Sequence, residues 1–212
     1  MTIAAAEPTT TRAMLKWIED RARSADRFRH IKEASNQHRR KHGCDVYPSD
    51  DGPTLGVLAA ASHARRLLEV GCGLGYSALW LAYGAGKDAL VETIEHVSQH
   101  AELARGHFHA EGMTDRLKVH EGRAVSVLQR LQSPYDLIYF DGDPAESLAD
   151  LKQFERLLRP GGLLISANLF LGVYDRHIPG LDKTARYRVR TSKAKEWLTA
   201  YLPNGLALSI RS

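Results

Sequence analysis

The sequence has few cysteines and no long apolar segment. Two cysteines in 212 residues, Cys44 and Cys72, cannot build a disulfide framework. The longest apolar runs, such as residues 161–165, are far shorter than the ~20 residues that span a bilayer. Residues 1–11 lack the basic start and apolar core of a secretory signal. We therefore expect a cytoplasmic globular protein without a membrane partner, as its 43% hydrophobic and 25% charged residues also indicate.

The sequence also lacks a strong overall charge, and its small positive excess lies near the N-terminus. The formal net charge is +4. Residues 1–42 hold ten Lys/Arg and five Asp/Glu, hence +5, while the rest holds 19 and 20, hence −1. Such a basic segment suits an anionic acceptor, a nucleic acid or a solvated helix face. Because no RNA-binding aromatic motif accompanies it, we favour the solvated face and do not expect a nucleic-acid partner.

Apolar periodicity and turn signals divide the chain into a helical N-terminal cap and an α/β core. We expect a disordered lead at residues 1–10 and a single domain at 11–212, made of a cap at 11–61 and a core at 65–212. In the core, apolar strand patterns alternate with helical ones, which predicts a doubly wound, Rossmann-like sheet. We expect this sheet to be seven-stranded and mainly parallel, with an antiparallel C-terminal edge hairpin across Pro203-Asn204-Gly205.

The element bounds follow from the same patterns. Residues 159–162 predict a tight turn, and residues 189–198 predict a helix. The expected strands cover residues 66–70, 89–94, 117–120, 136–140, 163–166 and 206–210.

A glycine-rich turn follows the first expected strand, where an open parallel sheet binds its ligands. Gly71, Gly73 and Gly75 alternate between an apolar strand and an apolar helix. Glycine lets a ligand approach the backbone, and the free N–H groups of the helix start then face that ligand. The spacing Gly-x-Gly-x-Gly differs from the Gly-x-Gly-x-x-Gly of NAD-binding loops. Glu69 adds a carboxylate that would repel a pyrophosphate but pair with an ammonium, which favours S-adenosylmethionine (SAM) over NAD.

Polar residues end the next strands at the same edge of the sheet. Glu95 lies 20 residues after Gly75, about where an acidic residue accepts hydrogen bonds from ribose hydroxyls. His96 and the turn Gly122-Arg123-Ala124 are expected to flank the adenine. Asp141, Asp143 and Asn168 follow the fourth and fifth strands, and a carboxylate there can receive a proton, bind a metal or orient the cofactor amine.

These residues resemble a known family. Residues 68–78, Leu-Glu-Val-Gly-Cys-Gly-Leu-Gly-Tyr-Ser-Ala, resemble motif I of class I SAM-dependent methyltransferases, and their Gly-Tyr-Ser resembles the catechol and caffeoyl-CoA type of O-methyltransferase. Residues 135–141, 157–162 and 202–206 carry the same likeness, which covers about residues 45–212. The resemblance implies transfer of a methyl group to a hydroxyl of a small aromatic acceptor, phenolic or anionic, and a homodimer, since dimers are common in that family.

The resemblance also implies residue roles. Glu69 would hold the methionine amine, and Glu95 the ribose. Asp141 and Asn168 would act in catalysis and ligate a divalent metal such as Mg²⁺. The full set implied to bind SAM is Tyr47, Glu69, Gly71, Gly73, Tyr76, Ser77, Glu95, His96, Gly122, Arg123, Ala124 and Asp141.

The sequence departs from the family pattern at two positions. Ala167 stands where the family has a second carboxylate ligand, and Pro144 stands where some members have a lysine base. The sequence therefore leaves open whether a metal is bound and which residue acts as the base. Candidate replacements are Asp143 as a ligand and His38, His42 or His177 as a base, although such histidines are commonly surface residues.

Other functions stay open at this point. The two departures also fit a SAM-binding protein with lost or altered catalysis. The basic N-terminus fits a methyltransferase for a nitrogen or nucleic-acid acceptor, although residues 141–144 do not match the Asp-Pro-Pro-Tyr type of motif found in such enzymes. An NAD oxidoreductase is the least favoured reading. The identity of the methyl acceptor does not follow from the sequence, because late loops and N-terminal helices build such pockets.

Overall fold

A computed structural model describes residues 10–50, 52–132, 134–142, 147–169, 185–193, 195–202 and 205–212. Several predictions from the sequence lie outside these described residues. They are the disordered lead at residues 1–9, Asp143 as a ligand, Pro144 at the position of the base, His177 and the Pro203-Asn204 part of the hairpin.

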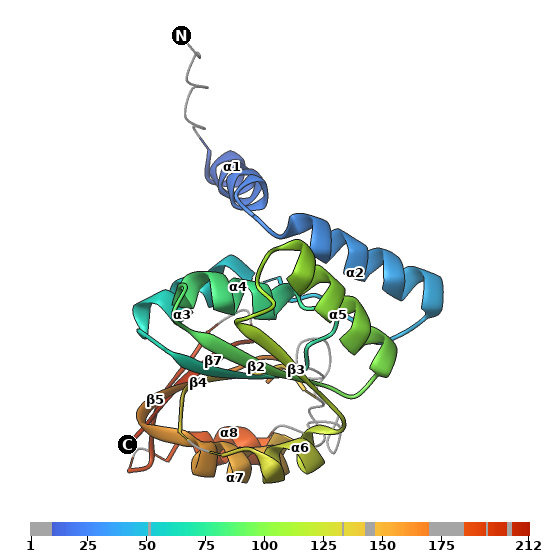
Figure 1. The fold of residues 1–212 in the computed structure, drawn as a ribbon. Helices are drawn as coiled ribbons and strands as arrows, with labels where there is room; N and C mark the ends of the chain where they lie inside the picture. Colours follow the sequence, from blue (N-terminus) through green and yellow to red (C-terminus); the bar gives the residue numbers. More distant parts are fainter. Residues whose placement is uncertain are drawn as a thin grey trace.

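Seven strands form one sheet in the order β3-β2-β1-β4-β5-β7-β6 (Figure 1). The first five strands in this order run parallel, as the sequence predicts, and β7 runs antiparallel to both β5 and β6. The strand order reverses between β1 and β4, which makes that position the switch point of a doubly wound sheet. The bounds are β1 Arg66–Val70, β2 Leu90–Glu95, β3 Leu117–Glu121, β4 Tyr135–Phe140, β5 Leu158–Ser166, β6 Trp197–Tyr201 and β7 Ala207–Arg211.

Helices cover both faces of the sheet (Figure 1). One face carries α3, α4 and α5, with α2 outside them, and the other carries α6, α7 and α8. The first helix, α1, extends away from this body. None of the helices in the described part of the chain combines the length and apolar content needed to cross a membrane. The bounds are α1 Thr11–Ser24, α2 Arg29–His42, α3 Gly52–Ala61, α4 Tyr76–Ala85, α5 Ser98–Ala110, α6 Ala124–Arg130, α7 Ser147–Leu157 and α8 Ala185–Thr191.

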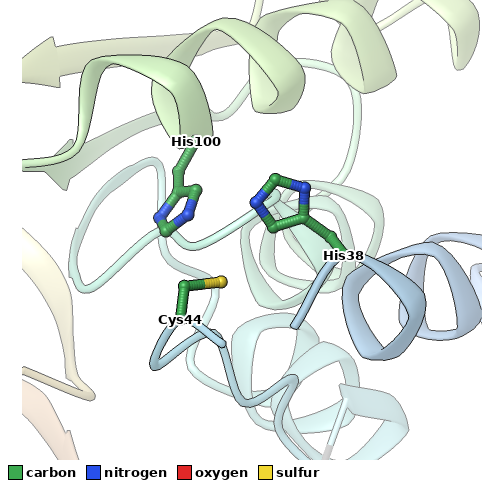
Figure 2. A group of neighbouring side chains, drawn as sticks. All are labelled: His38, Cys44 and His100. Carbon is green, nitrogen blue, oxygen red and sulfur yellow. The ribbon is translucent and has the colours of Figure 1, made fainter. Parts of the chain in front are cut away.

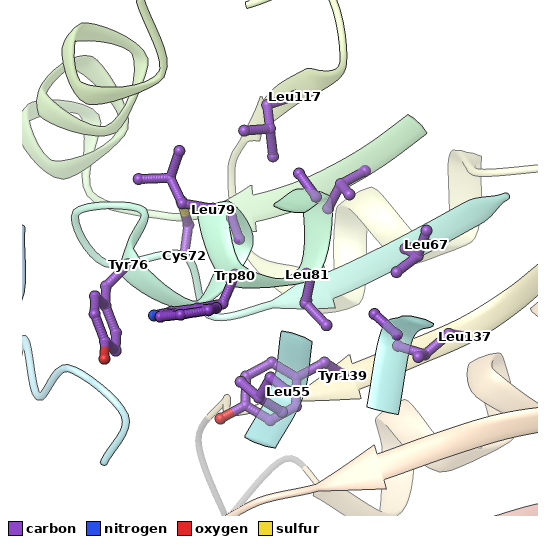
Figure 3. Packing of buried hydrophobic residues seen from close by; sticks show 14 of the residues in the cluster. Leu55, Leu67, Cys72, Tyr76, Leu79, Trp80, Leu81, Leu117, Leu137 and Tyr139 are labelled. Atoms are coloured by element: carbon purple, nitrogen blue, oxygen red, sulfur yellow. The ribbon is translucent and has the colours of Figure 1, made fainter. Parts of the chain in front are cut away.

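Each face of the sheet has its own apolar core, because successive strand residues point to opposite faces. Leu67 and Leu137 pack under α4 with Leu81, as Figure 3 shows, whereas Leu68 and Ile138 belong to the cluster under α6 and α7. All of these side chains are fully buried. Truncating such a buried leucine to alanine lowers the free energy of unfolding by roughly 2–5 kcal/mol. This packing therefore holds the strands that carry the site firmly in place.

The N-terminal cap is joined to the core through Asp26, between α1 and α2. Its carboxylate accepts hydrogen bonds from the Tyr76 hydroxyl at 2.7 Å and from the Trp80 indole N–H at 3.3 Å. Phe28 is fully buried and packs edge-to-face against Trp80, with ring centroids 5.2 Å apart. These contacts hold the start of α2 against α4, the helix that follows the glycine loop.

Two predictions for the C-terminal third were wrong. The helix predicted at 189–198 ends at Thr191, and Trp197–Tyr201 is the edge strand β6. The apolar residues at the two ends of the predicted helix, Val189 and Leu198, are 68% and 74% exposed, so they do not form one buried stripe.

The tight turn predicted at 159–162 lies within β5. Tyr135 pairs with Leu158 and Leu137 with Leu163, so the residues between bulge out of the ladder. The antiparallel hairpin is confirmed, but its antiparallel strand β7 lies inside the sheet and β6 forms the edge.

Candidate active site

A cavity of about 1040 Å³ opens at the carboxyl ends of the parallel strands, next to the switch point between β1 and β4. A pocket for one drug-sized ligand occupies about 300–1,000 Å³, so this cavity has room for a nucleotide-like ligand and a small second molecule. The structure brings nearly all of the predicted site residues together here. The lining includes Tyr47, Gly71, Gly73, Tyr76, Ser77, Glu95, His96, Gly122, Arg123, Ala124, Asp141 and Asn168.

The glycine loop forms the floor of the cavity, and its first glycine is required by a close approach of two strands. Gly71 has φ +97°, and a Cβ atom placed on it would overlap the backbone carbonyl oxygen of Asp141. Its N–H and that of Cys72 both donate to the carbonyl of Ile94, at 3.1 Å. The loop therefore fits tightly between the ends of β2 and β4, with backbone rather than side chains facing the ligand.

Glu95 at the end of β2 holds three parts of the cavity wall together. Its Oε2 accepts a hydrogen bond from the N–H of Gly73 at 2.8 Å, and its Oε1 accepts one from Val97 at 2.9 Å. Its backbone carbonyl accepts the N–H of Gly122 at 2.8 Å. The side chain is 6% exposed, and carboxylate oxygens retain further lone pairs for ribose hydroxyls. The ribose role stays a prediction.

The turn after β3 carries the predicted adenine border. Gly122 adopts φ +138°, and Arg123 follows in an extended conformation as the N-cap of α6. Ala124 is the first residue of that helix. Since Glu95 and Gly122 are hydrogen-bonded through their backbones, the predicted ribose and adenine contacts are held at a fixed separation.

Among the predicted site residues that the structure describes, Glu69 alone does not line the cavity. It is completely buried in β1, where its carboxyl accepts hydrogen bonds from the Thr93 and Ser77 hydroxyls. Burial raises the pKa of Glu69 to about 8, and the nearby carboxylates of Asp141 and Glu95 add to the increase. Its Oε1 atom has no hydrogen-bond partner among the described residues. Ser77, which interacts with the Glu69 carboxyl, does line the cavity.

Two tyrosines belong to the set predicted to bind SAM. Tyr76 is buried and donates its hydroxyl to Asp26, and burial followed by this hydrogen bond raises its pKa above the usual range. Tyr47 is 66% exposed, with the Arg39 guanidinium 4.4 Å from its ring centroid. Tyr76 therefore presents its ring rather than a free hydroxyl, and Tyr47 lies at the rim.

Asp141 and Asn168 meet at the ends of β4 and β5. The side-chain Nδ2 of Asn168 donates to Oδ1 of Asp141, and the Tyr139 hydroxyl lies 3.2 Å from Oδ2. Asn168 has φ +61°, a conformation that asparagine tolerates better than most residues. Burial and the neighbouring Asp141 carboxylate raise the pKa of Tyr139 well above its usual range, so this hydroxyl stays a donor. Both donors fix the orientation of the Asp141 carboxylate.

This donor set does not fit a Mg²⁺ ion well. Mg²⁺ prefers near-octahedral oxygen ligands and is held in proteins mainly by carboxylates. Asp141 supplies a single carboxylate, and Asn168 turns its amide nitrogen toward that carboxylate. Ala167, at the position of the second family carboxylate, is 8% exposed and carries no ligand atom. We therefore assign no reaction step to a metal.

The cavity wall also contains residues that the sequence did not single out together. His38, Cys44 and His100 come from α2, the loop after it and α5, and all line the cavity. Burial lowers the pKa of His38 and of His100, and neighbouring histidines add to both decreases. No sequence spacing links positions 38, 44 and 100, because only the tertiary fold brings α2 against α5. His42, also considered as a base, is exposed.

Comparison with known proteins agrees with this geometry. Residues 68–168 match a methyltransferase domain family. A catechol O-methyltransferase from Mycobacterium tuberculosis is 38% identical over 183 residues, which cover 76% of this chain and 79% of that protein.

Solved structures show the same fold. An O-methyltransferase from Bacillus cereus in complex with SAH is 25% identical with a TM-score of 0.71, covering 86% of this chain and 91% of that one. An SAH-bound methyltransferase from Podospora anserina has a TM-score of 0.79 at 20% identity and covers 99% of this chain and 100% of its own.

Proposed function

Since the chain belongs to the SAM-dependent O-methyltransferases of the catechol and caffeoyl-CoA type, we propose that it methylates a hydroxyl group of a small aromatic compound. The single observation that carries this proposal is the 38% identical relative named a catechol O-methyltransferase. The cavity supports it, because about 1040 Å³ accommodates a small acceptor beside SAM. Membership of this family supports enzymatic O-methyl transfer and argues against an NAD oxidoreductase.

We assign the chain's own groups to SAM as follows. Glu95 accepts hydrogen bonds from the ribose hydroxyls, and its contacts to the N–H groups of Gly73 and Val97 keep it in place. His96 and residues 122–124 border the adenine. The methionine part lies over Gly71 and Gly73, with Ser77 backed by Glu69 near its amine. The bound SAM supplies a methyl group activated by a positively charged sulfur.

Asp141 is the group we assign to the acceptor proton. In the transfer, the acceptor oxygen forms a bond to the methyl carbon, the carbon–sulfur bond breaks, and its electron pair stays on sulfur. The hydroxyl proton moves to the Asp141 carboxylate, which the Asn168 amide and the Tyr139 hydroxyl hold in a fixed orientation. Most of the rate enhancement then comes from proximity and alignment of the two substrates in the cavity.

The proposal is tested by measuring S-adenosylhomocysteine (SAH) formation from SAM across a panel of catechols, phenols and matched anilines. We expect turnover with hydroxyl acceptors and none with the anilines. Each reaction is run with and without added Mg²⁺, and we expect equal activity in the two, because Ala167 removes a carboxylate ligand. SAH formation with anilines alone would contradict the proposal, and strict Mg²⁺ dependence would contradict the assignment of the proton to Asp141 without a metal.

We also propose that the chain forms a homodimer. Leu15 and Ile18 on α1 are 56% and 50% exposed, on a helix that extends from the body of the molecule (Figure 1). A second copy would cover these side chains. Light scattering of the full chain and of the Leu15→Ser/Ile18→Ser variant tests this, and a monomeric wild-type chain would contradict it.

A further inference from the structure

Three side chains that can ligate a metal converge on one part of the cavity wall. The ligand atoms of His38, Cys44 and His100 all lie within 4.8 Å of one another. Figure 2 shows the two imidazole rings next to each other, with the sulfur of Cys44 directed toward the space beneath them, and the rings meet edge-to-face with centroids 5.2 Å apart. The three residues come from α2, from the loop after α2 and from the first turn of α5. Thiolate and imidazole are the soft and borderline donors that transition-metal ions prefer.

The fold holds each of the three ligands in place. Gly43 ends α2 in a left-handed conformation, φ +63°, and its N–H donates to the carbonyl of Arg39 at 2.8 Å. This turn brings Cys44 back beneath His38. His100 is 6% exposed, and its Nδ1 lies 3.9 Å from Oε1 of Glu95. The backbone geometry therefore preforms the cluster without a bound ion.

We propose that His38, Cys44 and His100 bind a divalent transition-metal ion, with zinc as the best chemical match. Two imidazoles and one thiolate are ligands that Zn²⁺ takes in tetrahedral sites. Bond lengths of about 2.0–2.3 Å place tetrahedral ligands about 3.5 Å apart, so the side chains close by about 1 Å on binding. The fourth position is open to water or to His42, whose ring centroid lies 4.4 Å from that of His38.

The surroundings suit such an ion. A ligating histidine commonly directs its second ring nitrogen toward a carboxylate. Oε1 of Glu95 is near Nδ1 of His100, at 3.9 Å, which is beyond hydrogen-bond distance but close enough for a favourable charge interaction. The Cys44 thiolate and the Glu95 carboxylate together balance the two charges of the ion. This site is separate from the family metal position at Asp141 and Asn168, and it uses nitrogen and sulfur rather than oxygen ligands.

The position of the cluster predicts a link to cofactor binding. Val46 follows two residues after Cys44. Its Cγ1 atom would lie 3.4 Å from a Cβ atom placed on Gly73 of the glycine loop, so the two residues are in contact range. Glu95 in turn accepts the N–H of Gly73. An ion that ties α2 and the loop after it to α5 therefore also fixes the wall against which the glycine loop rests. We expect the metal-loaded protein to bind SAH more tightly than the metal-free protein.

The test is a Co²⁺ titration of the untagged full chain after removal of metals with a chelator. We expect binding of one ion per chain with a thiolate-to-cobalt charge-transfer absorption, and displacement by Zn²⁺ but not by Mg²⁺. Cys44→Ser should abolish that absorption, and His38→Gln should weaken Co²⁺ binding at least about ten-fold. SAH affinity, measured by calorimetry with and without Zn²⁺, should rise with the metal in the wild type and stay constant in Cys44→Ser.

His109→Gln is the matched control, because His109 is an exposed histidine on α5 that lies outside the cluster. It should bind Co²⁺ within two-fold of the wild type, and circular dichroism of each variant checks its fold. Two variants from different elements keep the test valid if one of them does not fold. A wild-type Co²⁺ complex without thiolate absorption, or equal affinities in the wild type and both ligand variants, would overturn the site.

Discussion

The carboxylate of Glu95 accepts a hydrogen bond from the backbone N–H of Gly73 at 2.8 Å, so an acidic side chain at the end of β2 holds the glycine loop that follows β1. The same carboxylate accepts the N–H of Val97 at 2.9 Å. A residue proposed to bind the ribose is thus also a structural support of the loop on which the methionine part would lie. Removing the Glu95 side chain would abolish both the proposed ribose contact and the support of the glycine loop. Replacing the carboxylate by an amide instead keeps the size of the side chain and changes only which hydrogen bonds it can accept.

Glu95→Gln is expected to weaken SAH binding about 10- to 100-fold. A glutamine presents one amide donor where the carboxylate had an acceptor, so one backbone N–H loses its partner at a cost of about 1–3 kcal/mol. The measurement is calorimetric titration with SAH. Glu121→Gln is the matched control, since Glu121 is the residue of β3 paired with Glu95 and is exposed. Equal affinities of the two variants would show that Glu95 does not act on the cofactor side.

Gly71→Ala is expected to destabilise the protein more than Gly86→Ala does. Both glycines have positive φ, +97° and +86°, a backbone conformation that L-residues rarely adopt, so each variant loses about 1–3 kcal/mol of stability from backbone strain. Only at Gly71 would the new Cβ overlap the carbonyl of Asp141, whereas at Gly86 no atom lies within 4 Å. Urea denaturation should show a further loss of about 1–3 kcal/mol for Gly71→Ala. Equal losses would mean that β1 and β4 separate easily at this point.

The glycine loop and the residues at the strand ends could be predicted from the sequence, because the patterns that identify them lie within short continuous segments. The strand at 66–70 and the alternating glycines occupy one continuous stretch, and the parallel topology then brings Glu95, Asp141 and Asn168 to the same edge. The position of Glu69 behind Ser77 could not be predicted, because it depends on which face of β1 the side chain takes. The edge strand β6 was mistaken for a helix because its apolar residue Leu198 is exposed rather than buried.

The cap illustrates the same limit. Helices α1 and α2 were predicted from periodicity, but the hydrogen bonds from Tyr76 and Trp80 to Asp26 join residues 50 and 54 positions apart. The convergence of His38 with His100 depends on the same docking of α2. Contacts of this kind have no spacing that a single sequence reveals.

Asp141→Asn is expected to lower kcat about 10²- to 10⁴-fold while the KM for SAM changes little. The amide cannot take the acceptor proton, and proton transfer by a positioned group contributes about this factor. Steady-state SAH formation with the best acceptor of the panel measures both parameters. The control is Asp88→Asn, whose side chain is 61% exposed and paired with Arg65 at 3.2 Å. Wild-type kcat in Asp141→Asn would assign the proton to another group.

The buried Glu69 is expected to make the folded protein less stable as the pH rises from about 4.5 to 8. Burial raises the pKa of Glu69 from 4.5 to about 8, so in this window the folded state keeps a proton that the unfolded state has released. Raising the pH therefore favours the unfolded state, by at most about 1.4 kcal/mol per pH unit, and the effect levels off above pH 8.

Glu69→Gln removes this titration and keeps the shape of the neutral carboxyl group. The Thr93 and Ser77 hydroxyls can still donate to the amide oxygen. We expect the variant to be no more stable than the wild type at pH 5. The difference in the free energy of unfolding between variant and wild type should then shift in favour of the variant by pH 8, as measured by urea denaturation at a series of pH values. Glu121→Gln serves again as the control, because an exposed glutamate should leave the pH profile parallel to that of the wild type. Parallel profiles for Glu69→Gln and the wild type would mean that Glu69 is ionised in the folded protein at pH 7, with a cationic or hydrogen-bonding partner near its Oε1 atom.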